Sequence, residues 1–486
     1  MGCEQAKFTG ATAQTGWQAG PRDNDPYRYQ VGYGNLFASE AVPGTLPEGR
    51  NNPQRLKYGL YPEQVNGSPF VNPRATNKKV WLYRIQPSVQ HNGFTQGKQN
   101  PFLVSDFSAS NTKAHANPTQ IFWPPFKLPD QSEKVDFIAG WKTVGGVGGA
   151  RLHEGFAVHM YLANADMEKK AFVDSDGDLL LVPEQGRLDI KTEMGSLMVR
   201  PGEIAVIQAG LKFQVFLPDG PSRGYIQEIY NAHYELPELG PLGANGMANP
   251  RDFEHPIASF DVDRSDWEVV YQITGEHFTC HLDHSPFDVV AWHGNYVPYK
   301  YDLSRFKIAG FVNNDHGDPS VLCVLTVKSK YPNVALSDFC VLSQRWEAME
   351  DTYRPPYFHR NTACELVGFI KVPSDGGLRA FHLPGGLSYQ SSFTPHGPPA
   401  SEHKAAVEKD LKPEKYMEGT LGFLFEPGFP MVFTEWALQG QGLEDIDVGL
   451  WKELTPDFLT HIDEIKADSQ KAAQTVNGVN GVNGHT

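Results

Sequence analysis

Three residues in the last third of the chain, His359, Glu365 and His396, are of the types that could together hold one metal ion. The first two lie in RPPYFHRNTACELVGFI (354–370) and the third lies in SSFTPHGPP (391–399). Two imidazoles and one carboxylate, with no cysteine in a ligating position, are typical of non-haem Fe(II) sites, whose open coordination positions accept O2. The pattern therefore predicts an Fe(II)-dependent oxygenase.

The chain must turn between His359 and Glu365 if both are to reach one metal. On a straight strand they would lie roughly 20 Å apart at about 3.3 Å per residue, and on a helix roughly 9 Å of rise would separate them on different faces. The predicted turn is at residues 360–362, because Asn361 tolerates turn geometry. The following ELVGFIKV alternates as a strand does, and His396 arrives from a later segment. Two strands and a return loop that meet at one metal favour a small β-barrel.

The three residues alone do not establish a metal site. With 17 histidines in 486 residues, an H-x5-E pattern followed by a later histidine also arises by chance. Most such side chains are solvated or hydrogen-bonded in place. The interpretation therefore depends on the rest of the chain.

Length, charge and cysteine content exclude several classes of protein. A chain of 486 residues suggests two or more core-forming units, and no stretch approaches the roughly 18 apolar residues of a membrane span. Its 42 basic and 57 acidic side chains give a net charge of −15, which disfavours nucleic acid and anionic membranes as partners. The five scattered cysteines indicate neither a disulfide framework nor a zinc site. Because the N-terminus also lacks the layout of a secretion signal, we expect a cytoplasmic protein.

Composition and strand patterning predict a mainly β fold. The chain is rich in Gly (47) and Pro (37), and its apolar runs are short, which is typical of sandwiches and barrels. Residues 184–216 look like part of a cupin barrel, but Lys212 stands near the position of a late histidine, and an ammonium is a poor ligand. We therefore predict two cupin-like or jelly-roll β-barrel units, with the iron site in the C-terminal one.

The predicted domain organisation has four parts. A flexible extension occupies residues 1–26, and a metal-free, cupin-like N-terminal β domain follows at 27–285. The cupin-like catalytic domain is expected at 286–452, and a short helix with a disordered, polar Val-Asn-Gly tail at 453–486.

Seven segments, in the same order along the chain, give it a resemblance to a known family. They are YGNLF (33–37), LPEGRNNPQ (46–54), DSDGD (174–178), LGPLGANGMANPRDF (239–253), PFDVVAWHGNYVPYKYDL (286–303), DPSVLCVLT (318–326) and RPPYFHRN (354–361). From about Tyr29 to Lys452 the chain resembles the homogentisate 1,2-dioxygenases, ring-opening enzymes of tyrosine and phenylalanine breakdown.

The resemblance implies a site, a cofactor and partners. His359, Glu365 and His396 would hold Fe(II), and His293 of AWHGN would be the acid–base histidine, a residue type that titrates near neutral pH. The substrates would be a small aromatic hydroquinone and O2, with no organic cofactor. Family members form hexamers, so the resemblance also implies a homo-oligomer. His316 of NNDHGDPS could lie near the iron or stabilise a turn, and both roles remain open.

Three positions of the expected substrate pocket depart from the family pattern. Ser374 stands where the family has a tyrosine, Gln390 where it has a histidine, and Phe358 where it has a second tyrosine after Tyr357. We expect Ser374, Gln390, His396 and Tyr357 to contact the substrate. Polar pocket groups decide sharply what a site accepts. The substrate is therefore either homogentisate or a different 2,5-dihydroxy aromatic, turned over by a paralogue in a specialised pathway.

Two other classes of function are weaker alternatives. A non-catalytic barrel protein would be favoured by loss of a metal ligand, and none is lost. A metal-dependent sugar-phosphate isomerase would need clustered cations, and only Arg354, Arg360 and Lys371 are near the candidate ligands. The sequence leaves open the oligomeric state and the ring bond that breaks if the substrate is not homogentisate.

Overall fold

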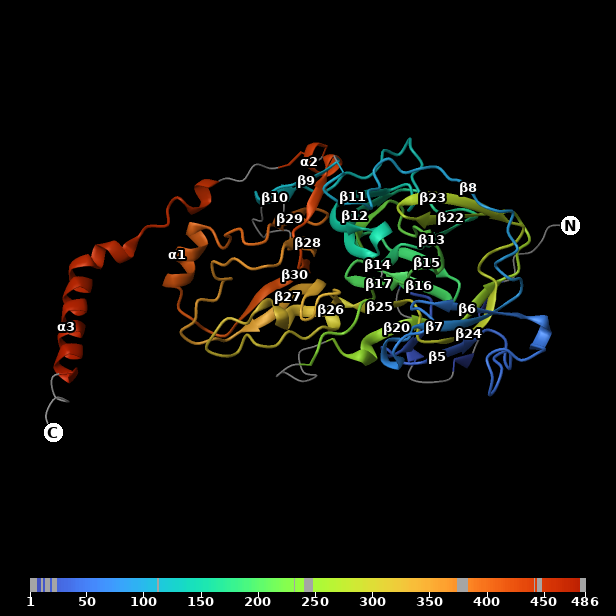
Figure 1. The fold of residues 1–486 in the computed structure, drawn as a ribbon, viewed down its shortest axis with the longest axis horizontal. Coiled ribbons are helices and arrows are strands. Elements are labelled where there is room, and N and C mark those ends of the chain that lie inside the picture. The colour runs from blue at the N-terminus through green and yellow to red at the C-terminus, as the bar shows by residue number, and fades with distance from the viewer. Residues whose placement is uncertain are drawn as a thin grey trace.

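A computed structural model describes residues 7–9, 12–13, 18–19, 24–111, 113–230, 232–239, 248–373, 383–440, 442–443 and 448–480. Strands dominate these ranges, so the prediction of a mainly β protein is confirmed (Figure 1). The described residues contain no helix that is long and apolar enough to cross a membrane.

A large antiparallel sheet, here called the central sheet, runs through both halves of the protein. Its middle strand β14 (Gly177–Gln185) is buried on both faces, which explains the continuous apolar run LLLVP. In spatial order the strands are β3 (Gln18–Ala19), β4 (Tyr29–Val31), β20 (Phe253–Pro256), β25 (Tyr299–Asp302), β17 (Glu203–Ile207), β14, β19 (Ser222–Tyr230), β12 (Glu154–Ala163), β11 (Trp141–Gly149), β31 (Val432–Thr434) and β9 (Ala114–Ala116).

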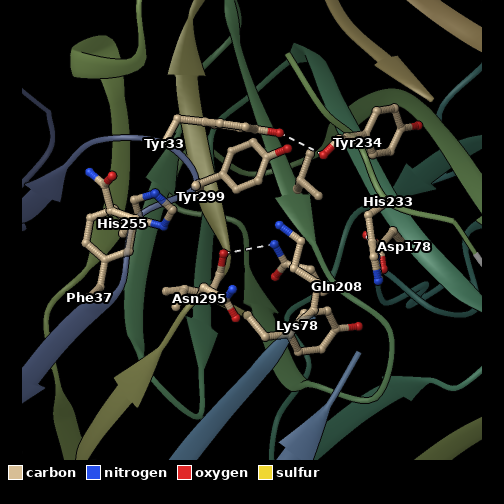
Figure 2. Close-up of a pocket in the computed structure, with 15 residues that line it drawn as sticks. Tyr33, Phe37, Lys78, Asp178, Gln208, His233, Tyr234, His255, Asn295 and Tyr299 are labelled. Carbon is tan, nitrogen blue, oxygen red and sulfur yellow. Dashed lines mark hydrogen bonds and ion pairs between the residues drawn. The ribbon is translucent and has the colours of Figure 1, made fainter. Parts of the chain in front are cut away.

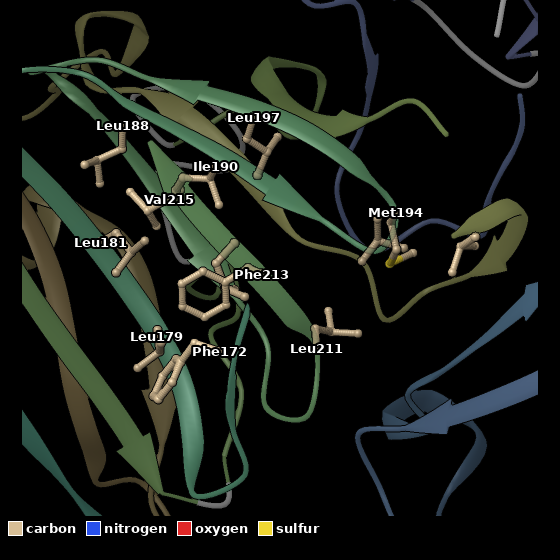
Figure 3. Packing of buried hydrophobic residues seen from close by; sticks show 14 of the residues in the cluster. Phe172, Leu179, Leu181, Leu188, Ile190, Met194, Leu197, Leu211, Phe213 and Val215 are labelled. Carbon is tan, nitrogen blue, oxygen red and sulfur yellow. The ribbon is translucent and has the colours of Figure 1, made fainter. Parts of the chain in front are cut away.

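A second sheet, the N-terminal sheet, packs on one face of the central sheet. Leu179 and Leu181 of β14 meet Ile190 and Phe213 in this core, part of which Figure 3 shows. Gly186, Gly195 and Gly202 lie at turns between strands, each with a positive φ that suits glycine. The strands are β16 (Gly195–Val199), β15 (Leu188–Thr192), β18 (Lys212–Phe216), β13 (Lys170–Asp174), β22 (Trp267–Ile273), β23 (Glu276–Leu282) and β8 (Thr95–Gln96).

A third sheet, the C-terminal sheet, packs on the opposite face of the central sheet. The alternate residues of β14, Leu180 and Val182, meet Leu366 and Phe425 in this second core. The two β units therefore share the central sheet. The strands are β10 (Ile121–Trp123), β29 (Leu387–Gln390), β28 (Glu365–Lys371), β30 (Glu414–Pro427), β27 (Ala335–Glu347) and β26 (Cys323–Lys328).

Smaller sheets complete the β structure of the described ranges. One contains β2 (Thr12–Ala13), β5 (Phe37–Glu40), β24 (Val289–Gly294), β7 (Lys79–Arg84) and β6 (Tyr61–Asn66), and the other pairs β1 (Lys7–Thr9) with β21 (Ser259–Asp261). Strands β24 and β25 thus pair with strands from the N-terminal part of the chain. The division into domains at 285 and 286 stays a prediction.

The α-helices of the described residues all lie near the C-terminal end of the chain. Helix α1 (Ala400–Glu408) covers the first half of the charged segment 401–416, whose end belongs to β30, and α2 (Glu435–Gln439) follows β31. Helix α3 (Ile462–Asn480) projects from the body of the protein in Figure 1. It is longer than the short helix expected at 453–486, because helix-favouring alanine, lysine and glutamine residues continue up to residue 474. The helix also covers residues 476–480, part of the tail that was expected to be disordered.

Lys212, which stands where a barrel ligand was expected, belongs to a buried network of charges. Its ammonium lies 3.0 Å from Oε1 of Glu193, and Glu193 also pairs with Arg84. The Arg84 guanidinium further binds Asp288 at 3.0 Å and Glu63 at 2.9 Å, and it helps to hold the pKa of Glu63 at about 2 against burial, which raises it. Lys212 therefore neutralises buried carboxylates of the N-terminal unit.

We expect Arg84→Met to lower the free energy of unfolding by about 3–5 kcal/mol, because it leaves buried carboxylates without their shared cation. Chemical denaturation followed by circular dichroism measures the change. The matched control is Arg151→Met, whose guanidinium lies 3.5 Å from Glu276 at the exposed surface and should contribute less than about 1 kcal/mol. Equal effects of the two variants would contradict the structural role of the network.

Candidate metal centre

The two histidines are brought together by a short antiparallel bridge. The backbone N–H of His359 donates to the carbonyl of His396 at 3.0 Å, and the reverse bond measures 3.2 Å. The imidazole centroids consequently lie 4.1 Å apart. Gly397 permits this approach, since a Cβ there would lie 2.5 Å from the Phe358 ring and 3.1 Å from the Phe358 Cα.

Glu365, the first residue of β28, reaches both histidines. The chain bends at residues 362–363, next to the predicted turn, and then enters the strand. One carboxylate oxygen, Oε1, lies 3.2 Å from Nε2 of His359 and 3.2 Å from Nε2 of His396. The amide of Asn361 donates to the same oxygen at 3.2 Å. The potential ligand atoms of the three residues all lie within 4.8 Å of one another, so the structure brings the three candidates together.

The hydrogen bonds of the two imidazoles leave their Nε2 atoms available to bind a metal. Nδ1 of His359 lies 2.8 Å from the carbonyl oxygen of Tyr357, and Nδ1 of His396 lies 2.9 Å from that of Thr394. A carbonyl only accepts, so each Nδ1 carries a hydrogen, and each Nε2 donates to Glu365 when it is protonated and presents a lone pair to a metal once it has lost that proton. Metal-binding histidines are commonly oriented in this way. The donor set therefore fits Fe(II).

The electrostatic environment keeps the carboxylate ionised. Burial raises the pKa of Glu365, but hydrogen bonds to His359 and His396 outweigh it and lower the pKa to about 2. The hydrogen bond to Glu365 in turn raises the pKa of His359. Glu426 on the neighbouring β30 is close enough for repulsion, since burial first and the Glu365 charge second raise its pKa to about 7. A cation between the three groups would relieve this excess of negative charge.

Of the expected substrate-binding residues, Gln390 lies closest in the sheet to the carboxylate. It pairs directly with Glu365 across β28 and β29, and its buried Oε1 has no hydrogen-bond partner among the described residues. Tyr357 is engaged elsewhere, because its hydroxyl donates to Asp318 at 2.6 Å. Ser374 lies outside the described residues.

The structure does not bring His293 to the three residues. It lies on β24, in a different part of the molecule from β28 (Figure 1), and its Nε2 is 3.2 Å from the Tyr83 hydroxyl. Burial, with Lys79 nearby, lowers its pKa. Its role as the acid–base group therefore stays a prediction from the resemblance.

A different histidine, His316, lies close to the metal candidates. Its ring packs edge-on against Tyr357 at 5.8 Å, and the Tyr357 ring lies 5.6 Å from that of His359. Both ring nitrogens of His316 are buried without a hydrogen-bond partner of good geometry in the described ranges. Buried polar atoms are nearly always paired, so an unpaired imidazole is suited to hydrogen-bond a bound substrate. Of the two roles left open for His316 from the sequence, these contacts favour the one beside the candidate metal ligands.

Two histidines and a carboxylate beside a β-sheet are the ligand set of mononuclear non-haem iron oxygenases. A family model of the homogentisate 1,2-dioxygenase N-terminal domain matches residues 28–303, and that of the C-terminal domain matches 304–458. The chain belongs to the homogentisate 1,2-dioxygenase family, and the expectation of a ring-cleaving dioxygenase is confirmed at the level of the family.

Relatives bearing that name come from plants and animals. The homogentisate 1,2-dioxygenase of Arabidopsis thaliana is 45% identical over 458 residues, covering 93% of this chain and 97% of the relative. That of Oryza sativa is 48% identical, covering 87% and 90%. That of Homo sapiens is 45% identical, covering 85% and 92%. The similarity therefore spans both halves of the chain.

Proposed function

We propose that this protein opens the aromatic ring of homogentisate with O2, using one Fe(II) held by His359, Glu365 and His396. The observation that carries the proposal is the convergence of two imidazole Nε2 atoms on one carboxylate oxygen. Bound Fe(II) would hold O2 and the hydroquinone together and pass electron density between them. The identity of 44–48% to relatives named homogentisate 1,2-dioxygenase supports the choice of substrate.

The residues around the candidate ligands would orient the substrate. Asn361 donates its amide N–H to Glu365, and its own Oδ1 is buried and unpaired among the described residues. The unpaired Oε1 of Gln390 lies on the other side of Glu365 in the sheet. Both oxygens can accept hydrogen bonds from a substrate hydroxyl or an ordered water, which would satisfy them.

We propose His316 as the group that accepts the proton from a substrate hydroxyl. Burial lowers the pKa of His316, so the imidazole is neutral at pH 7 and has a lone pair available. It packs on Tyr357, whose carbonyl orients His359, and this places it beside the candidate metal ligands. No comparable contact joins His293 to these ligands among the described residues, although the resemblance assigns the role to His293.

The second candidate function is cleavage of a related 2,5-dihydroxy aromatic, and the observation in its favour is Gln390. A glutamine is directly opposite Glu365 where the family has a histidine, so the hydrogen-bonding pattern beside the ligands differs. Ser374, which stands where the family has a tyrosine, also favours a different substrate, on the evidence of the sequence alone. Oligomeric assembly, cytoplasmic location and the hexamer of the family remain predictions.

The experiment that tests both candidates is anaerobic Fe(II) loading followed by oxygen uptake with homogentisate, hydroquinone, 2,5-dihydroxybenzoate and bulkier 2,5-dihydroxy aromatics. If the pocket is altered, a bulkier substrate should be preferred. Ser374→Tyr with Gln390→His should then raise kcat/KM for homogentisate roughly ten- to a hundredfold, the scale of a hydrogen bond to a charged group. Gln439→His, at an exposed position of α2, is the control.

Ordinary efficiency on homogentisate, with the double change neutral or harmful, would reject the second candidate and leave the first. Absence of oxygen uptake with every hydroquinone from iron-loaded protein would reject both.

A further inference from the structure

Three buried carboxylates meet between strands of the central and N-terminal sheets, outside the candidate metal centre. Asp174 is the last residue of β13, Asp176 lies in the turn that leads into β14, and Glu228 belongs to β19. The three side chains are 3%, 6% and 0% exposed. One oxygen of each lies within 4.8 Å of the corresponding oxygens of the other two. Ca²⁺–oxygen distances of about 2.3–2.6 Å allow two ligand atoms to be up to roughly 5 Å apart, so one cation could reach all three.

The first two acids belong to the motif DSDGD (174–178), which resembles the start of an EF-hand calcium loop. Such a loop needs a glycine at its sixth position and a glutamate at its twelfth, where this chain has Leu179 and Gln185. The motif forms a turn between two strands, in which the backbone N–H of Asp176 donates to Oδ1 of Asp174 at 2.8 Å. The third carboxylate therefore comes from a distant strand and not from the same loop.

A buried amide without a partner for its oxygen lies against the same carboxylates. Gln272 of β22 pairs with Asp174 across the parallel strands and is 0% exposed. Its Nε2 donates to Oε1 of Glu228 at 2.8 Å. Burial raises the pKa of Asp176, and backbone N–H groups and this amide oppose that rise through hydrogen bonds. Oε1 of Gln272 and Oδ2 of Asp174 are both buried without a hydrogen-bond partner among the described residues. Buried acceptors are nearly always satisfied, so these two oxygens indicate a bound ligand.

The negative charge of this cluster is not balanced by protein cations. In the part of the chain that the structure describes, no lysine or arginine forms an ion pair with any of the three carboxylates. Nε2 of His159 lies 3.0 Å from Glu228, but burial lowers the pKa of this imidazole to about 3, so it is neutral. Burial first, and then repulsion among the carboxylates, raises the pKa of Asp174 and of Glu228. One shared proton would neutralise one charge, whereas a divalent cation would neutralise two and also bind the unpaired oxygens.

We propose that Asp174, Asp176 and Glu228 bind one Ca²⁺ ion. Oε1 of Gln272 is a fourth ligand. The donors are all oxygens, which suits a hard cation, and Ca²⁺ takes about six to eight of them in flexible geometry, whereas Mg²⁺ usually keeps several water molecules. The ion joins the turn between β13 and β14 to β19 and β22, and so it stabilises the N-terminal unit. That unit was expected to be metal-free because of Lys212, which is not part of this cluster.

Asp178, the last acid of the same motif, provides a matched control. Its Oδ2 lies 2.8 Å from Nδ1 of His233, and the two side chains lie side by side in the pocket that Figure 2 shows. Its Oδ1 accepts the backbone N–H of Ala209 at 3.0 Å. Asp178 is 1% exposed, so Asp178→Asn changes a buried acid of the same motif that already has partners of its own.

Elemental analysis of the iron-loaded protein, purified with Ca²⁺ in every buffer and then desalted, tests the proposal. We expect about one calcium per chain in addition to the iron. Asp174→Asn and Glu228→Gln keep the shape of each side chain and remove its charge, so each should lower the bound calcium roughly tenfold or more, because affinity depends on the number of charged ligands. Asp178→Asn should keep its calcium.

Thermal unfolding gives a second measurement. Ca²⁺ should raise the unfolding temperature of the original protein and of Asp178→Asn by several degrees, because it binds the folded state. It should not raise that of Asp174→Asn or Glu228→Gln. If Ca²⁺ leaves the original protein unchanged and these two variants unfold at a higher temperature than it does, the carboxylates share protons and the proposal is wrong.

The double variant His359→Ala with His396→Ala locates the calcium. It should lose its iron and keep its calcium. If it loses the calcium while Asp174→Asn keeps it, the ion binds at the candidate metal centre and the proposal is overturned. Binding of Mg²⁺ in preference to Ca²⁺, or a desalted original protein without calcium, would equally overturn it.

Discussion

Alanine at His359, Glu365 or His396 is expected to remove most of the iron and to lower oxygen uptake by several orders of magnitude. The original protein should hold about one iron per chain after anaerobic loading, and each variant leaves only two of the three ligands. Activity falls with the metal because the metal is the group that activates O2. Elemental analysis of the desalted protein measures the iron, and an oxygen electrode measures the activity.

The control for this prediction is a histidine outside the centre. His403 on α1 is partly buried, and its Nδ1 lies 3.2 Å from the Tyr353 hydroxyl, so His403→Ala tests loss of an imidazole from the same half of the protein. It should retain iron and activity. Full iron occupancy in all three ligand variants would contradict the assignment of the metal centre.

The replacement His316→Gln should lower turnover roughly 10²–10⁴-fold while the iron content stays unchanged, the usual scale of general acid–base catalysis. Glutamine keeps a polar side chain of similar length but cannot accept and release a proton at neutral pH. Because His316 contacts Tyr357 and not the metal ligands directly, metal binding should survive. Stopped-flow measurements of turnover with saturating iron separate the two effects.

The matched variant is His293→Gln, which removes the contact with the Tyr83 hydroxyl. It should keep its iron and stay within a few-fold of the original activity. If His293→Gln loses turnover and His316→Gln does not, His293 is the acid–base residue. It would then have to act at the metal centre of a neighbouring chain in an oligomer. If His316→Gln lost its iron, His316 would be a metal ligand, and the three proposed ligands would have to be reassigned.

The sequence predicted those features that depend on residue type and local pattern. The alternation in ELVGFIKV predicted strand β28. Ligand chemistry and the family resemblance together selected His359, Glu365 and His396 from 17 histidines and many carboxylates. These three residues had to lie close together to bind one metal ion. The turn between His359 and Glu365 was expected because neither a straight strand nor a helix would bring them together.

Features that depend on long-range pairing could not be predicted. The isolated bridge between His359 and His396 joins two segments outside the strands. The position of Gln390 opposite Glu365 follows from strand register in the C-terminal sheet. The contact between His316 and Tyr357 joins two irregular segments that have no periodicity to read. The central sheet was also missed, because the two faces of β14 serve different cores and only the tertiary structure shows both.

The shared central sheet has a consequence for how the protein is made. Ribosomes deliver the N-terminal strands first, yet the partner of β10 (Ile121–Trp123) among the described strands is β29, which appears more than 260 residues later. Until then one apolar face of the central sheet has no covering layer, since Leu366 and Phe425 are not yet available. Pairings so distant in sequence form slowly, and the exposed face is a surface on which unfinished chains can aggregate. The C-terminal third of the chain therefore depends on the N-terminal part for its fold. A C-terminal fragment that contains all three candidate ligands would lack the central sheet, against which the C-terminal sheet packs.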